Sequence, residues 1–329
     1  MCVNKYSKLF LATLLSIIGL FFAFKGENLD ELSYHMVRVD ITGITLASIL
    51  LILSCFVRAF RWQLLLRPFD HITFSQVFGA TMVGYFGNGV LAFRLGELLK
   101  AYSVTKNNKK INLMQSFGTV IIERILDVGA VIAIFALLIP WFPFDDKYIK
   151  YGAFGFTGIT LIIIFSLYLA IKYSWINKIK GYKIFKSKHG QKLLLSFDSL
   201  FEGLTILNRT DSSLQIISSS IVLWSIYFIE TIILIKACGL DLGVIDAGII
   251  LFLGSIAIGI PALPGSAGTY DAGIKYSLII VFGIASERAL NYAIISHAVA
   301  YFPLLIIGFF YFLIGNVSLT EIKRIESVK

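Results

Sequence analysis

The sequence predicts an all-α, polytopic membrane protein, and three observations lead to that fold class. Hydrophobic residues make up 57% of the 329 positions, and the mean hydropathy is +0.82. Charged residues make up only 15%, so the chain lacks the polar side chains that a water-exposed surface needs. The apolar residues also gather in blocks that are long enough to cross a bilayer.

Six apolar segments are each predicted to cross the membrane as one helix, because a crossing takes about 20 residues. The first has Lys5 and Lys8 before its apolar run and so resembles a signal peptide. No small-residue cleavage site follows Phe24, and we therefore expect a retained helix. The six segments are 8–24, 41–58, 113–139, 150–171, 213–236 and 289–315.

Two further apolar stretches are interrupted, and each predicts a re-entrant hairpin of two short helices. Residues 74–104 are broken by four glycines from Gly84 to Gly96. Residues 244–282 are broken by the run from Pro261 to Gly268. Non-helical backbone at membrane depth needs support from protein or from a water-filled cavity, so both breaks are candidate site regions.

The distribution of Lys and Arg predicts the orientation. With a cytoplasmic N-terminus and two re-entrant hairpins, the cytoplasmic segments hold 21 of the 29 basic residues and the outer ends at most six. We therefore expect a single domain, 1–329, in the cell (cytoplasmic) membrane, with both termini cytoplasmic. The halves 41–139 and 213–315 then have opposite orientation, which is the arrangement of inverted repeats.

The segment 172–210, which joins the halves, predicts a basic cytoplasmic linker and an interfacial helix. Seven lysines lie between Lys172 and Lys192. An apolar stripe then follows at helical spacing, and a helix lying in the membrane interface fits it. Two interpretations stay open, namely solvated charge that sets the topology and recognition of anionic lipid head groups. The stripe consists of Leu193, Phe197, Leu200, Leu204 and Leu207.

Charge and motifs argue against several functions. The net charge of +9 is spread between apolar blocks and accompanies no base-stacking or groove-reading motif, so we expect no nucleic-acid partner. Cys2, Cys55 and Cys238 lack the spacing of metal ligands, and neither a metal nor a cofactor is expected. The sequence has no nucleophile elbow, Walker loop or HExxH stretch, so we do not predict an enzyme.

Ionisable residues inside apolar segments are functional candidates, because the bilayer disfavours a charge that is neither paired nor hydrated. At the first break, Arg94 offers a planar fork for phosphate, Gly96 permits close backbone approach, and Glu97 is expected to orient Arg94. The alternative is an internal ion pair at the cytoplasmic interface. These three residues are therefore candidates for substrate binding.

A second cluster lies within the predicted helix 113–139. Glu123 and Asp127 are four residues apart and share a helical face, and Arg124 can pair with Asp127 three residues later. Three charges in one spanning segment are a more specific signal than one. The alternative is a structural pair that locks this helix to the hairpins.

At the second break, Pro264, Gly265 and Gly268 interrupt the helix. A half-helix beginning near Ser266 directs its amides toward the break, where they favour a lipid phosphate. Alternatively, the break is only a kink, and Asp271 only compensates the helix dipole.

Three single residues in the second half are less specific signals. Glu230 is either a proton carrier or, as we favour, a hydrogen-bonded core residue. His297 is predicted to be structural, and Lys275 is expected to reach Asp271 at i, i+4.

Three motifs occur in a fixed order: Gly84…Asn88…Arg94-Leu95-Gly96-Glu97, then Glu123-Arg124…Asp127, then Leu263-Pro264-Gly265…Gly268…Asp271. In this order they resemble the lysylphosphatidylglycerol synthase transmembrane region, also called the flippase-like domain family. The similarity extends over about 8–315. Ala92 stands where the family usually has proline, Ser266 where a second glycine is common, and Asp271 where glutamate is usual. The resemblance implies the translocating part of the family and adds Asn88 to the candidates.

The resemblance implies lipid translocation between leaflets, with an anionic or phosphate-containing head group in a polar cavity. Arg94 and Arg124 are expected to hold the phosphate, and transport is downhill or ion-coupled. Membrane lipids are the expected partners, together with a separate lipid-synthesising enzyme. Two alternatives stay open: a membrane-embedded lipid-modifying enzyme or its subunit, and a scaffold that binds lipid without turnover.

Overall fold

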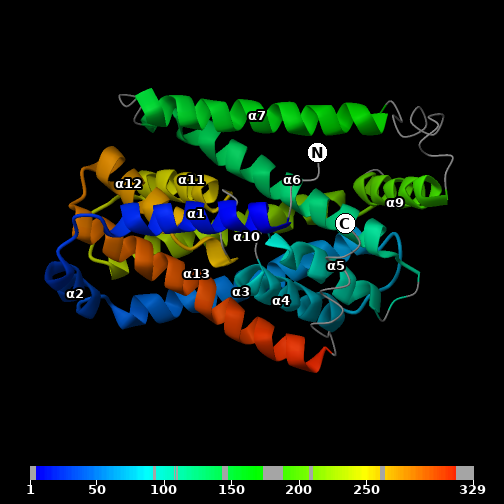
Figure 1. Ribbon diagram of the computed structural model, residues 1–329, viewed down its shortest axis with the longest axis horizontal. Helices are drawn as coiled ribbons and strands as arrows, with labels where there is room; N and C mark the ends of the chain where they lie inside the picture. The colour runs from blue at the N-terminus through cyan, green and yellow to red at the C-terminus, as the bar shows by residue number, and fades with distance from the viewer. Residues whose placement is uncertain are drawn as a thin grey trace.

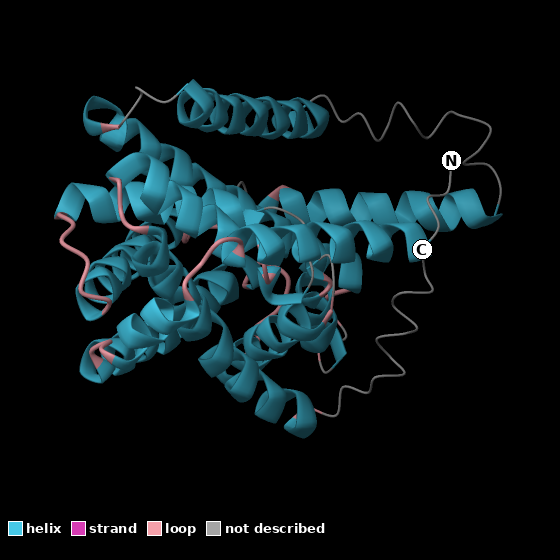
Figure 2. Ribbon diagram, turned by 60° about the vertical axis from the view of Figure 1, so that its left-hand side comes forward, coloured by secondary structure: helices cyan, strands magenta, loops and turns pink. Residues whose placement is uncertain are grey.

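The protein is an all-α membrane protein, as the sequence predicts. The computed structural model describes residues 5–91, 94–106, 108, 110–142, 147–172, 188–206, 210–259 and 264–315. Within these ranges all regular secondary structure is helical (Figures 1 and 2). Three of the described helices are long and apolar enough to cross a membrane: α3 (Ile41–Leu66), α10 (Ser213–Ala237) and α13 (Ser286–Ile314).

The other predicted spans also coincide with long helices. These are α1 (Lys5–Phe24), α6 (Leu113–Leu138) and α7 (Lys147–Lys172). The short α2 (Leu29–Val37) follows α1, and a 3-10 turn, η2 (Ile139–Trp141), ends α6. Figure 1 shows α1, α3, α7 and α13 running roughly along the long axis of the molecule. Polar side chains cap the N-termini of two helices. The Asp40 carboxylate accepts hydrogen bonds from the amides of Thr42 and Gly43 at the start of α3. Asn112 forms a capping box with Gln115 at the start of α6.

Each interrupted stretch consists of two helices, as predicted. The first contains α4 (Phe74–Val90) and α5 (Gly96–Lys106). The second contains α11 (Val244–Gly259), a 3-10 turn η5 (Pro264–Ser266) and α12 (Thr269–Phe282), so the second half-helix begins three residues later than the predicted start near Ser266. Arg94 and Ser266, with φ of 53° and 63°, are the two described non-glycine residues in left-handed backbone, and each lies in a break. Figure 1 shows α4 and α5 to the right and α11 and α12 to the left of the helical bundle.

The two halves make corresponding helix contacts. Helix α3 packs against α10 at the centre, α4 packs against α13, and α11 packs against α6. The contacts α3–α4, α4–α5 and α5–α6 have counterparts in α10–α11, α11–α12 and α12–α13. Exchanging α3–α6 for α10–α13 therefore preserves this contact pattern.

The helix predicted after the basic linker is present as α9 (Lys188–Leu204), and it packs against the beginning of α6. Two hydrogen bonds join these helices, from Asn112 to Ser199 at 3.1 Å and from Gln115 to Glu202 at 2.8 Å. The linker residues 173–187 and Leu207 lie outside the described residues. The interfacial position of α9 stays a prediction.

Gly96 holds the two helices of the first hairpin close together, as its predicted role in backbone approach requires. A Cβ atom added at Gly96 would overlap the carbonyl oxygen of Gly84 and the side chain of Asn88. The neighbouring atoms are backbone or belong to a short side chain, so they have little freedom to move aside.

We therefore expect Gly96→Ala to destabilise the protein by about 1–3 kcal/mol through overpacking between α4 and α5. Thermal unfolding of the purified protein in detergent measures this loss. The matched control is Gly129→Ala in α6, because no atom lies within 4 Å of a Cβ built there. Equal unfolding temperatures for the two variants would contradict the close approach at Gly96.

Candidate functional site

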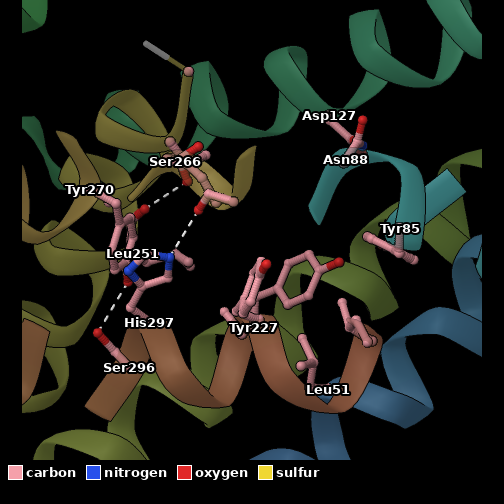
Figure 3. A pocket seen from close by; sticks show the side chains of 18 of the residues that line it. Leu51, Tyr85, Asn88, Asp127, Tyr227, Leu251, Ser266, Tyr270, Ser296 and His297 are labelled. Atoms are coloured by element: carbon pink, nitrogen blue, oxygen red, sulfur yellow. Dashed lines mark hydrogen bonds between the residues drawn. The ribbon is translucent and has the colours of Figure 1, made fainter. Parts of the chain in front are cut away.

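A cavity of about 820 Å³ lies between the two hairpin breaks. Helices α3, α4, α6, α10, α11 and α13 all contribute to its wall, so both halves of the chain form it. Figure 3 shows Asn88, Asp127 and Tyr85 on one side of this cavity and His297, Tyr270 and Ser266 on the other. Its volume is in the range of small-molecule sites.

The two breaks are connected to one another across the cavity. The Arg94 guanidinium donates a hydrogen bond to the carbonyl oxygen of Ile258, near the end of α11. The Tyr301 hydroxyl, on α13, donates to the carbonyl oxygen of Gly89 at 2.9 Å. The ring of Tyr301 also lies against Gly265, where an added Cβ would be 2.5 Å from a ring carbon. The backbone of each break is therefore held by residues from the other half.

A buried network of charged side chains borders the cavity, with Asp127 at its centre. The Asp127 carboxylate lies 2.8 Å from Arg58, 2.6 Å from Arg61 and 3.2 Å from Arg124. Arg58 also donates to the Tyr227 hydroxyl at 3.1 Å. The predicted pair of Arg124 with Asp127 is confirmed, and two arginines from α3 complete it.

Glu97 and Glu123 pair with the remaining cations of the network. Glu97 lies 2.9 Å from Arg124, and Glu123 lies 2.5 Å from Lys100. The expectation that Glu97 orients Arg94 is therefore wrong. Glu97 instead lies in the first turn of α5, where it pairs with Arg124 of α6.

Cations outnumber acids around this part of the cavity. Three acids, Glu97, Glu123 and Asp127, lie among five basic residues, and with Glu230, which also lines the cavity, one basic residue remains in excess. Arg94 is exposed in the cavity, and no carboxylate lies within 4 Å of it in the described part of the chain. The five basic residues are Arg58, Arg61, Arg94, Lys100 and Arg124. An anion in the cavity would therefore meet a favourable field.

Asp271 and His297 form a pair at the second break. His297 Nδ1 lies 2.9 Å from Asp271 Oδ1, and Nε2 lies 2.9 Å from the Gly265 carbonyl oxygen. The other carboxylate oxygen, Oδ2, accepts the Gly268 amide at 2.9 Å, so Asp271 caps α12 as the dipole interpretation expects. This bond occupies the Gly268 amide, and phosphate binding by the amides that follow it stays a prediction.

The structure brings most of the predicted site residues together. Those that line the cavity are Asn88, Arg94, Glu97, Arg124, Asp127, Glu230 and Gly265. Glu230 is 7% exposed, and no hydrogen bond of its carboxylate occurs among the described residues, so the hydrogen-bonded interpretation is not supported.

The other predicted site residues lie behind the cavity wall. Glu123 is fully buried in the charge network, and Asp271 lies behind His297. Gly268 packs against α1, where an added Cβ would overlap the carbonyl oxygen of Ser16. Gly96 begins α5 and lies against α4, and Pro264 begins η5.

Lys275 does not reach Asp271, so that expectation is wrong. Its ammonium group lies 2.5 Å from Glu27 and 2.7 Å from the Ala23 carbonyl oxygen, and it thereby joins α12 to the end of α1. Asp271 is already engaged by His297 and by the cap of its own helix.

Sequence reasoning missed Arg58, Arg61, Lys100 and the participation of His297. The predicted boundary at 58 places both α3 arginines at or beyond the end of the helix, which is wrong, because α3 continues to Leu66 and leaves them 5% and 0% exposed. A signal was present, since Trp62 and Leu64–Leu66 extend the apolar run beyond them.

Comparisons with known proteins agree with the predicted resemblance. A family model described as the lysylphosphatidylglycerol synthase TM region matches residues 9–308. The chain is 22% identical over 326 residues to the UPF0104 membrane protein PH1989 of Pyrococcus horikoshii, covering 93% of this chain and 96% of that protein. It is 21% identical over 312 residues to the glycosyltransferase AglD of Haloferax volcanii, covering 83% of this chain and 49% of AglD. No solved structure matches the chain.

Proposed function

Because the chain belongs to the lysylphosphatidylglycerol synthase transmembrane-region family, we propose that it moves a lipid between membrane leaflets by passing the head group through the central cavity. The observation that carries this proposal is a cavity shared by both hairpin breaks, in which Arg94 is exposed and has no carboxylate within 4 Å among the described residues. A phosphate-containing head group fits such a cavity, while the acyl chains stay in the hydrocarbon phase, where their burial costs nothing.

Arg94 is the proposed phosphate ligand. It has no acidic partner within 4 Å among the described residues, and its planar fork can donate two parallel hydrogen bonds to phosphate oxygens. Arg124 lines the same cavity, with 35% of its side chain exposed, but Glu97 and Asp127 hold it in position. Its proposed role is to contribute positive electrostatic potential to the cavity.

The proposed architecture is a pair of inverted repeats, 41–139 and 213–315, with α4–α5 entering from the cytoplasm and α11–α12 from outside. The corresponding helix contacts of the two halves support it. Four basic residues that border the cavity are no longer counted as cytoplasmic, namely Arg58, Arg61, Arg94 and Lys100. The cytoplasmic segments still hold a large excess of Lys and Arg, which supports cytoplasmic termini in the cell membrane. In such transporters the substrate lies where the repeats meet, and the two halves open in turn.

A separate lipid-modifying enzyme is the proposed partner. The chain matches about half of AglD, a protein whose name is that of a glycosyltransferase. A membrane part that also occurs within a longer enzyme supports a division of labour, in which one protein modifies the lipid and this chain moves it.

Exchange of a fluorescent lipid in vesicles tests the proposed function. The full chain is reconstituted with head-group-labelled phosphatidylglycerol, and a membrane-impermeant reductant bleaches the outer leaflet. We expect the protein to increase the fraction bleached, relative to vesicles without protein, and mass spectrometry to find the lipid unaltered. A chemically altered lipid would favour an enzyme, and bound lipid without exchange would favour a scaffold.

A further inference from the structure

Both ring nitrogens of His297 face oxygen acceptors. The Gly265 carbonyl can only accept a hydrogen bond, so Nε2 must carry a proton. Asp271 faces Nδ1 with one oxygen and accepts the Gly268 amide with the other. A neutral imidazole with its proton on Nε2 would present a lone pair to a carboxylate, and the two would repel each other.

The observed pair of contacts therefore requires one proton between Nδ1 and Oδ1. We infer that His297 and Asp271 form a proton-binding site whose occupancy sets the shape of the second break and couples lipid movement to protons. The coupling rests on the function proposed above, whereas proton binding rests on the two contacts alone. Proton carriers in transporters are commonly histidines and acids inside the membrane, and coupling ions commonly bind at broken helices.

Loss of the proton breaks one of the two contacts. If the remaining imidazole proton lies on Nε2, the contact with Asp271 is lost, and if it lies on Nδ1, the contact with Gly265 is lost. Gly265 and Ser266 are consecutive residues in left-handed backbone, which is unfavourable for Ser266 and has to be held by its surroundings. The imidazole is one of the groups that hold it, so proton loss frees this turn to change conformation.

The turn can transmit this change to the other half of the protein. Gly265 and Ser266 line the cavity, and Gly265 lies against the ring of Tyr301. The hydroxyl of Tyr301 in turn donates to the Gly89 carbonyl oxygen beside the first break. His297 itself lines the cavity, so the proton can pass to water or to a head group there.

The groups around His297 favour this role. Asp271 on α12 is its charged partner, and the Tyr270 ring of the same helix has its centroid 5.1 Å from the imidazole. Tyr301 lies one turn along α13, with a centroid distance of 6.1 Å, and Glu230 of α10 lines the same cavity. Figure 3 shows His297 on the side of the cavity away from Asp127, so it does not belong to the arginine network.

Nitrogen NMR of the full chain labelled with 15N-histidine tests proton binding. We expect the His297 signal, assigned by its loss in His297→Gln, to be that of an imidazolium at neutral pH. Asp271→Asn should convert it to a neutral imidazole, because the Asn amide can itself donate to Nδ1. The matched control is Ser277→Ala, which removes a hydroxyl that donates to the Gly273 carbonyl oxygen within α12 and leaves both contacts of His297 in place. A neutral His297 in the wild type, unchanged by Asp271→Asn, would overturn the proton site.

Vesicles with an imposed pH gradient test the coupling. Net movement of the labelled lipid should change at least twofold when the gradient is reversed, and His297→Gln should lose this dependence. Equal movement under both gradients in the wild type would overturn the coupling. If no vesicle moves lipid at all, the proposed function fails, and the NMR experiment still decides whether His297 and Asp271 bind the proton.

Discussion

We expect Arg94→Gln to slow lipid exchange about 10- to 100-fold, because a hydrogen bond to a charged group contributes about 1.5–3 kcal/mol and 1.4 kcal/mol is a factor of ten. The guanidinium is exposed in the cavity, and its described hydrogen bond goes to the Ile258 carbonyl oxygen. Its removal should therefore change the thermal unfolding temperature little. The bleaching assay on vesicles measures the exchange rate, and the amount of lipid that copurifies with the protein measures binding.

Two further variants separate the geometry of Arg94 from its charge. Arg94→Lys keeps the charge and loses the planar fork, so its exchange rate should lie between those of the wild type and Arg94→Gln. Arg67→Gln removes the same charge from the exposed C-terminal end of α3, away from the cavity, and should exchange lipid at the wild-type rate. An Arg67→Gln variant as slow as Arg94→Gln would show that overall charge, rather than a cavity ligand, controls the rate.

Helix positions could be predicted from the sequence because the bilayer leaves few choices. Backbone groups in hydrocarbon must bond within their own segment, so each long apolar block becomes a helix. Glycine and proline permit the breaks, which is why both interrupted stretches divide where predicted, into α4–α5 and α11–α12. The boundary at 58 is wrong for a physical reason, since a charge normally ends an apolar helix, whereas Arg58 and Arg61 lie within α3 and are buried by pairing with Asp127.

The site could be predicted only as far as its contacts are local. The pair of Arg124 with Asp127 is three residues apart on one helix and was therefore readable from spacing. Asp127 lies 69 residues from Arg58 along the chain, and Lys275 lies 248 residues from Glu27. Which buried cation meets which acid depends on the packing of separate helices, and helical periodicity carries no information on it.

Competition for Asp271 illustrates the same limit to local reasoning. Spacing alone favours Lys275, one turn along the same helix. The carboxylate instead caps its own helix through Gly268 and contacts His297 on α13. A capping bond fixes the carboxylate at the beginning of the helix, so it cannot also extend toward the next turn.

The largest loss of stability is expected for Asp127→Asn. The wild-type carboxylate holds three arginines from two helices, and Arg61 is completely buried. Removing the acid takes away the nearest carboxylate of Arg58 and Arg61, which are 5% and 0% exposed, and breaking a buried pair of this kind costs about 3–5 kcal/mol. Thermal unfolding in detergent can be followed by tryptophan fluorescence or by loss of the monodisperse peak in size-exclusion chromatography. The unfolding midpoint of the variant should be much lower than that of the wild type.

Asp70→Asn is the matched control, because Asp70 pairs at 3.4 Å with an exposed lysine, Lys110. Such a surface pair contributes about 0–1 kcal/mol, so this variant should unfold close to the wild-type temperature. The double variant Asp127→Asn with Arg61→Met decides the cause. If the loss comes from an uncompensated charge, removing one arginine should recover part of the stability, and the two changes should not add. Additive losses would indicate that Asp127 acts by packing alone, and the charge network would then not be what holds α3 against α6.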